Sequence, residues 1–169
     1  RMQTDFGALD ILMMDSAAPL TVANFMNYVN DGDYDNSFVH RVAEYTDPAA
    51  PLFPVGTPLA VQGGDYIMTG PAGSFFSTGV IPVPQDPPVV NEFNQPNLRG
   101  TMAMAKVAEQ LVINGNVVPG SGADSATSGW FFNMSDNSAT LDGQNGGFTV
   151  FARVLGTGMN IIDAIAALR

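Results

Sequence analysis

The segment Arg99-Gly100-Thr101-Met102-Ala103-Met104-Ala105, together with the segments around it, carries the most information about the fold of this chain. Those segments are, in order, Phe38-Val39-His40-Arg41-Val42, Val61-Gln62-Gly63-Gly64-Asp65, Asp124-Ser125-Ala126-Thr127-Ser128 running into Trp130-Phe131-Phe132-Asn133, Leu141-Asp142-Gly143, and Gly147-Phe148-Thr149-Val150-Phe151. Most contain short apolar or alternating runs, which are typical of β-strands. The 18 Gly and 12 Pro residues place turns between them, as in a mainly β domain.

Helices are predicted at two places only. In Pro19–Asn30, Val22, Phe25, Met26 and Val29 follow the spacing of one apolar helix face, and Asp31-Gly32 is a plausible stop. A second helix is predicted over Gly158–Leu168. Strands are predicted around Leu9–Met14, Ser37–Val42, Leu59–Gln62, Gly100–Ala105, Trp130–Asn133 and Phe148–Val154.

In their order and spacing, these segments resemble the cyclophilin family of peptidyl-prolyl isomerases, in a form similar to the bacterial members. The resemblance covers nearly the whole chain and implies a single domain over residues 1–169. It also implies a closed eight-stranded antiparallel β-barrel capped by two α-helices, with the active face on the outside. The chain ends at Arg169, just after the second predicted helix, so we expect the family's last strand to be absent or the barrel edge to be managed otherwise.

Composition excludes several classes of function. The net charge of −10 argues against nucleic-acid binding, and zero Cys with one His exclude thiol catalysis, zinc–thiolate sites and any mechanism with two histidines. No apolar run reaches the ~18–20 residues of a membrane span. Few lysines and no cysteines favour a periplasmic or exported location, with the cytoplasm as the alternative. The resemblance implies proline-containing polypeptides as partners, and we expect a monomer.

Prolyl isomerisation suits a chain with few ionisable groups. An X–Pro bond prefers trans by only ~0.5–1 kcal/mol, but a barrier of roughly 18–20 kcal/mol separates the two forms because amide resonance is lost in between. No bond breaks and no proton has to leave, so an arginine, a hydrogen-bonding amide and an apolar pocket are enough. The reaction requires no cofactor and no metal, and we expect neither.

The resemblance assigns a role to individual residues. Arg41 matches the catalytic arginine and Gln62 the glutamine that positions it, whereas His40, which alternates away from Arg41, is interpreted as structural. Phe131 matches the floor of the proline pocket, with Phe132 as the alternative if the register slips by one residue. The remaining predicted substrate-binding positions are Leu59, Ala60, Ala105, Lys106, Gly129, Leu141 and Phe148.

Several of these positions depart from the family pattern. Leu59 and Ala60 stand where the family has an aromatic residue and a methionine, and Gly129 stands where it has a glutamine. One hypothesis is that Phe53 folds back to supply the missing ring. An insertion at about Ala108–Gly122 either packs on the barrel or forms a hairpin around Asn114-Gly115. These departures reduce the apolar lining of the pocket. A proline-peptide binding module with weak or no isomerase activity is therefore the alternative function.

Overall fold

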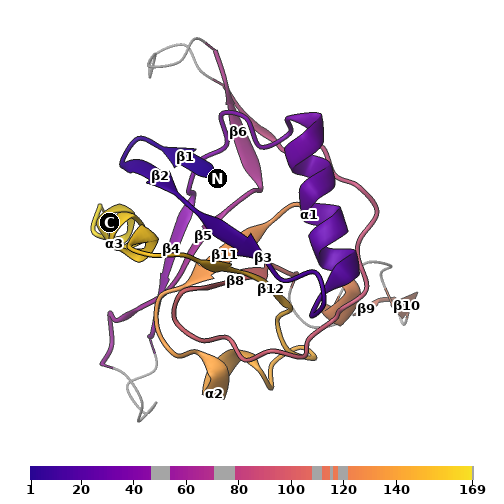
Figure 1. Cartoon of the computed structure of the whole chain (residues 1–169). Helices are drawn as coiled ribbons and strands as arrows, with labels where there is room; N and C mark the ends of the chain where they lie inside the picture. The colour runs from indigo at the N-terminus through magenta and orange to yellow at the C-terminus, as the bar shows by residue number, and fades with distance from the viewer. Residues whose placement is uncertain (47–53, 71–78, 108–111, 115, 118–121, 169) are drawn as a thin grey trace.

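The computed structural model describes residues 1–46, 54–70, 79–107, 112–114, 116–117 and 122–168. Its central feature is a six-stranded antiparallel sheet (Figure 1). Across the sheet the strands follow the order β3 (Ile11–Met13), β12 (Val150–Val154), β8 (Thr101–Met104), β11 (Trp130–Asn133), β5 (Pro58–Gly63) and β4 (Arg41–Glu44). The segment Arg99–Ala105 contains β8, a central strand in which Met102, Ala103 and Met104 are fully buried.

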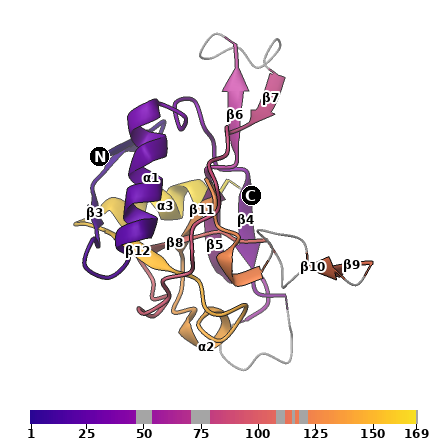
Figure 2. The ribbon, with the colours of Figure 1, turned by 90° about the vertical axis from the view of Figure 1, so that its right-hand side faces the viewer.

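Other strands pair in separate two-stranded ribbons: β1 (Met2–Thr4) with β2 (Gly7–Leu9), β6 (Tyr66–Thr69) with β7 (Gly79–Pro82), and β9 (Val112–Ile113) with β10 (Asn116–Val117). The β9–β10 pair corresponds to the second of the two alternatives for this insertion, the hairpin around Asn114, whose φ of 52° suits a tight turn. Figure 2 shows the β6–β7 ribbon projecting from one end of the molecule.

The prediction of a closed eight-stranded barrel is wrong. Among the described residues the sheet is not closed by hydrogen bonds, since its outer strands β3 and β4 each pair with one neighbour only. Four further strands pair with each other and not with a strand of this sheet, β1 with β2 and β6 with β7. Closing a short loop costs less chain entropy than closing a long one, and apolar alternation identifies a strand without naming its partner.

Both predicted helices are present, as α1 (Pro19–Asp31) and α3 (Gly158–Ala166). They cover one face of the sheet, where Val22 and Phe25 of α1 and Ile162 of α3 join a core that includes Met102 and Phe132. The short helices η1 (Gly122–Asp124) and α2 (Ser138–Leu141) were not predicted, because three or four residues are too few to show a helical period. In the described part of the chain, no helix combines the length and apolar character needed to cross a bilayer.

The start of α1 is capped by a residue far away in the sequence. The local N-cap position, Ala18, makes no side-chain cap hydrogen bond. Glu92 replaces it, because its carboxylate accepts hydrogen bonds from the backbone N–H of Leu20 at 3.1 Å and of Thr21 at 2.7 Å. The hydroxyl of Thr21 donates to the same carboxylate at 2.8 Å. A negative charge at a helix N-terminus is favourable, so Glu92 ties the loop before β8 to the helix that covers the sheet.

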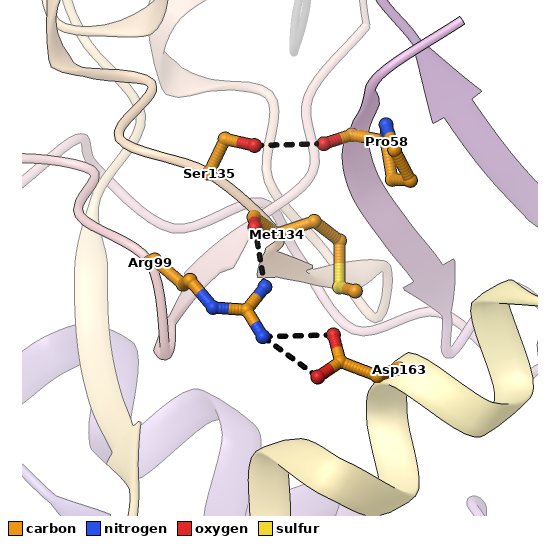
Figure 3. Close-up of polar contacts among 5 residues, drawn as sticks. All are labelled: Pro58, Arg99, Met134, Ser135 and Asp163. Carbon is orange, nitrogen blue, oxygen red and sulfur yellow. Dashed lines mark hydrogen bonds and ion pairs between the residues drawn. The ribbon is translucent and has the colours of Figure 1, made fainter.

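An arginine clamp attaches α3 to the end of β11 (Figure 3). One nitrogen of the Arg99 guanidinium donates to the two carboxylate oxygens of Asp163 at 2.8 and 2.7 Å, and another donates to the carbonyl oxygen of Met134. Next to Met134, the hydroxyl of Ser135 donates to the carbonyl oxygen of Pro58 at 3.0 Å. These contacts hold α3, β11 and β5 together from outside the sheet.

We expect Asp163→Asn to lower the free energy of unfolding by about 0.5–1 kcal/mol, because the clamp loses its charge while both side chains stay partly in solvent. The matched control is Asp10→Asn, which removes the more exposed pair with Arg1. Chemical denaturation of the two variants checks this. Equal losses of stability, or none for Asp163→Asn, would show that the Arg99 clamp contributes nothing beyond an ordinary surface ion pair.

Candidate active site

One row of paired residues crosses the sheet and places the candidate site. Arg41 on β4 pairs with Gln62 on β5, and Gln62 pairs with Phe131 on β11. Phe131 pairs in turn with Ala103 on β8, and Ala103 with Val150 on β12. Directly paired residues of antiparallel strands point to the same face of a sheet. All five side chains therefore lie on one face, opposite the face that α1 and α3 cover.

The alternation of side chains along β11 separates the two faces. Trp130 and Phe132 belong to the main core, whereas Phe131 lies in a smaller apolar cluster with Ala103, Leu141 and Val150. The structure thus places Phe131, and not Phe132, on the face that carries Arg41. Phe131 meets Phe148 edge to face, with ring centroids 5.7 Å apart at an angle of 78°.

A pocket of about 330 Å³ opens over this smaller cluster. Its lining contains all the sequence-predicted site residues except Gly129, namely Arg41, Leu59, Ala60, Gln62, Ala105, Lys106, Phe131, Leu141 and Phe148. Phe131 and Leu141 are buried and form the floor, whereas Arg41 is exposed at the rim. Among the described lining residues, Phe131 and Phe148 supply the only aromatic rings. Phe53, the hypothetical replacement for the family's missing ring, lies outside the described residues.

Gly129 lies behind the pocket. Its carbonyl oxygen accepts a hydrogen bond from the backbone N–H of Ala105 at 2.9 Å, so it supports β8 from the neighbouring chain segment. A side chain at this position would collide with Asp65, because an added Cβ would lie 2.3 Å from Asp65 Oδ1. The position is therefore a close backbone approach, and Gly129 is absent from the pocket lining.

The lining also contains Ala43, Glu44, Thr140 and Gln144, which the sequence analysis missed. Ala43 could have been found, because it stands two residues after Arg41 and so shares its strand face. Glu44 follows a shift in register between Ala43 and Glu44 that no sequence pattern marks. Thr140 and Gln144 flank Leu141 in and after α2, a helix too short to leave a periodic signal.

A short chain of hydrogen bonds fixes the polar end of the pocket. Arg41 Nη1 donates to Gln62 Oε1 at 3.2 Å, and Gln62 Nε2 donates to Asp65 Oδ2 at 3.1 Å. The guanidinium is thus held at the rim through a side-chain amide, and most of its N–H groups make no hydrogen bond to the part of the chain that the structure describes. An arginine held in this way can donate hydrogen bonds to a ligand in the pocket.

Lys106 fastens the opposite wall of the pocket. Its ammonium donates to the carbonyl oxygen of Asn145 at 2.8 Å and to that of Gly147, and it lies 4.9 Å from the ring centroid of Phe148. In return, Asn145 Nδ2 donates to the carbonyl oxygen of Val107 at 3.0 Å. Burial lowers the pKa of Lys106 to about 8. The end of β8 and the Phe148 segment are therefore tied together from both sides.

Three fully buried asparagines support the pocket from below. Asn97 Nδ2 donates to Asp142 Oδ1 at 2.9 Å and to the carbonyl oxygen of Phe148 at 3.0 Å. Asn133 Nδ2 donates to Asn97 Oδ1 at 3.1 Å, and Asn137 Nδ2 donates to Asn133 Oδ1 at 2.7 Å. Because buried amides cost stability unless they are paired, this network holds the segments that carry Leu141 and Phe148 in one arrangement.

Comparison with known proteins assigns this chain to a family. A family model described as cyclophilin type peptidyl-prolyl cis-trans isomerase/CLD matches residues 1–169. The chain belongs to the cyclophilin family. Among the curated cyclophilin-family relatives, peptidyl-prolyl cis-trans isomerase A of Dickeya dadantii is 33% identical over 171 residues, covering 99% of this chain and 70% of the relative. Peptidyl-prolyl cis-trans isomerase B of Escherichia coli is 30% identical, covering 96% of this chain and 80% of the relative.

A solved cyclophilin is also similar in fold. The crystal structure of a cyclophilin type peptidyl-prolyl cis-trans isomerase from Cryptosporidium parvum superposes with a TM-score of 0.62 at 18% identity. The match covers 98% of this chain and 82% of that chain. The resemblance stated from the sequence motifs is confirmed, and the cyclophilin fold holds without a sheet closed by hydrogen bonds among the described residues.

In this cyclophilin, affinity for proline peptides should fall as the pH rises through about 8. Lys106 is charged below its pKa of about 8 and neutral above it, so its attraction for two carbonyl oxygens and for the Phe148 ring weakens. Peptide titrations from pH 6.5 to 9.5 check this, with Lys106→Met as the control that should lack the step. A step of equal size in Lys106→Met would assign the titration to another group.

Proposed function

We propose that this chain catalyses the cis–trans isomerisation of X–Pro peptide bonds in polypeptides, with the proline ring on Phe131 and the peptide bond beside Arg41. One observation carries the proposal: a hydrogen-bonded Arg41–Gln62 pair stands at the rim of an apolar pocket whose floor is Phe131. The curated relatives are named as enzymes of this reaction.

The pocket fits what the reaction requires. As the X–Pro bond twists, its resonance is lost, the nitrogen becomes pyramidal and its lone pair becomes available to a donor. Catalysis follows if the site stabilises this twisted amide more than either planar form. The buried ring of Phe131, with Phe148 and Leu141 beside it, gives the proline ring an apolar surface that it can hold while the preceding carbonyl turns.

Arg41 supplies the donor. The rigid fork of N–H groups of an arginine serves the proline nitrogen or the flanking carbonyl without a proton transfer. Gln62 holds one of these N–H groups at 3.2 Å and thereby limits the rotation of the guanidinium. A donor fixed before the substrate arrives needs no reorganisation in the transition state, which is the source of electrostatic catalysis.

The charges around the pocket favour neutral or basic polypeptides. The chain carries 16 acidic residues against 6 basic ones, and such a surface attracts cationic segments. Arg41 and Lys106 are local exceptions inside the pocket lining, where Glu44 also lies. We expect them to act on carbonyl oxygens and aromatic faces, while the surrounding acidic surface acts on the flanking residues of the substrate.

Arg41→Ala should lower kcat/KM for a proline-containing test peptide by about 100-fold or more, because the twisted amide loses a preorganised charged donor. A protease-coupled isomerisation assay measures this. The matched control is Arg153→Ala, which removes an exposed arginine of β12 outside the pocket and should leave the rate unchanged.

Leu59 and Ala60 line the pocket where the family has an aromatic residue and a methionine, and with Gly129 in place of a glutamine they favour the alternative of a proline-peptide binding module. The same assay separates the two functions when peptide affinity is measured in parallel. Acceleration above the uncatalysed rate that disappears in Arg41→Ala supports the isomerase. Peptide binding without acceleration would contradict the isomerase and support the binding module.

A further inference from the structure

Two residues of the sequence motifs, His40 and Asp65, do not line the pocket but meet directly behind its polar end. His40 Nε2 lies 3.1 Å from Asp65 Oδ2, with the two side chains 15% and 29% exposed. The same carboxylate oxygen accepts the hydrogen bond from Gln62 Nε2 at 3.1 Å. A continuous path therefore runs from His40 through Asp65 and Gln62 to Arg41.

The carboxylate decides which way the Gln62 amide faces. A side-chain amide has a donor end and an acceptor end, and the two are nearly identical in shape. Only the acceptor end can serve Arg41, since the guanidinium has donors alone. An ionised carboxylate has acceptors alone, so Asp65 attracts the Nε2 end and leaves Oε1 facing Arg41. Without Asp65, the amide is free to turn its N–H groups toward those of Arg41.

His40 holds the carboxylate in place as a neutral donor. Burial lowers the pKa of His40, and this effect outweighs the attraction of Asp65, while Arg41 lowers the pKa further. Its Nδ1 atom is buried without a hydrogen-bond partner among the described residues, which suits an unprotonated nitrogen. The proton is then on Nε2, directed at Asp65. The backbone N–H of His40 donates to the carbonyl oxygen of Gln62 at 3.1 Å and fixes the imidazole relative to β5.

Gly129 closes the other side of Asp65. An added Cβ at this position would lie 2.3 Å from Asp65 Oδ1 and 3.1 Å from its Cγ, so only glycine lets the carboxylate occupy this place. Asp65 is thus confined between an imidazole, an amide and bare backbone. These contacts hold the carboxylate in one orientation, and the hydrogen bond from Gln62 Nε2 then fixes the orientation of the Gln62 amide.

We propose that Asp65 is a positioning residue of the isomerase site: held by His40 and by the backbone at Gly129, it orients the Gln62 amide so that Gln62 in turn holds Arg41. The proposal rests on the proposed isomerase function. It differs from a purely structural role because the effect of Asp65 on catalysis has to pass through Gln62.

Asp65→Ala should lower kcat/KM by about 5- to 10-fold, mainly through kcat, because Arg41 loses its fixed orientation. Asp65→Asn should retain more activity, since its carbonyl oxygen still accepts from Gln62. In the Gln62→Ala background, Asp65→Ala should lower kcat/KM by less than about a further twofold, because the effects of two residues that act through one path are not additive. The control is Asp86→Ala, which removes a carboxylate that accepts from the side-chain amide of Asn27 at 2.7 Å. Melting temperatures identify any variant that is merely unfolded.

A second variant moves the carboxylate without removing it. Gly129→Ala has no backbone strain to overcome, so its new Cβ should displace Asp65 and lower kcat/KM in the wild-type background but not in Asp65→Ala. The Gln62 side-chain amide resonances in an NMR spectrum should shift in both Asp65→Ala and Gly129→Ala and remain unchanged in Asp86→Ala. This measurement reads the orientation of Gln62 even if the protein has no isomerase activity.

The outcomes separate the two proposals. No acceleration by the wild-type protein contradicts the proposed function, and the amide resonances then decide on Asp65 alone. Wild-type activity with full activity in Asp65→Ala or in Gln62→Ala overturns the positioning role. The positioning role is also overturned if Asp65→Ala lowers kcat/KM equally in the wild-type and Gln62→Ala backgrounds. It is likewise overturned if the Gln62 side-chain amide resonances do not shift.

Discussion

The site depends on one constraint, the register that pairs Arg41 with Gln62, Gln62 with Phe131, Phe131 with Ala103 and Ala103 with Val150. Side chains alternate along a strand, so a slip of one residue in any of these pairs would move a functional side chain to the opposite face. The main core fixes the register. Trp130, Phe132 and Met102 fill the opposite face under α1 and α3 and leave Phe131 and Ala103 no choice of side.

The two faces are stabilised by different physics. The helix-covered face gains its free energy from apolar burial, which is tolerant of small shifts. The pocket face is supported by directional contacts: the Asn97–Asn133–Asn137 network beneath it, Lys106 across one wall and Asp65 behind Gln62. Hydrogen bonds weaken steeply when their geometry changes, so they fix distances more sharply than apolar contacts do. A pocket that has to hold a twisted amide therefore benefits from walls that are fixed by hydrogen bonds.

The sequence predicted the elements with long or regular patterns and the residues whose motifs are specific. Both long helices, the strand positions around Trp130–Asn133 and Thr101–Met104, and the family were found in this way. Strand pairing was not predictable in the same way, because β1–β2 and β6–β7 close on themselves for reasons of loop entropy that alternation does not report. Gly129 is the predicted site residue that does not line the pocket, because a motif position gives no direction for a residue without a side chain. The lining residues Ala43, Thr140 and Gln144 were missed because they are not motif residues themselves, although they stand next to or near residues that are.

The scarcity of cations sharpens what the site requires. The chain has 6 Lys and Arg residues, and two of them, Arg41 and Lys106, line one pocket in a protein with a net charge of −10. Among the described residues, neither Arg41 nor Lys106 forms an ion pair across the pocket. Each is held by neutral groups, Arg41 by an amide oxygen and Lys106 by carbonyl oxygens and a ring. A carboxylate in direct contact with Arg41 would neutralise the donor that the twisted amide needs. The carboxylate of Asp65 contacts Gln62 and not Arg41. It therefore orients the arginine through the Gln62 amide, and the charge of Arg41 remains available to the substrate.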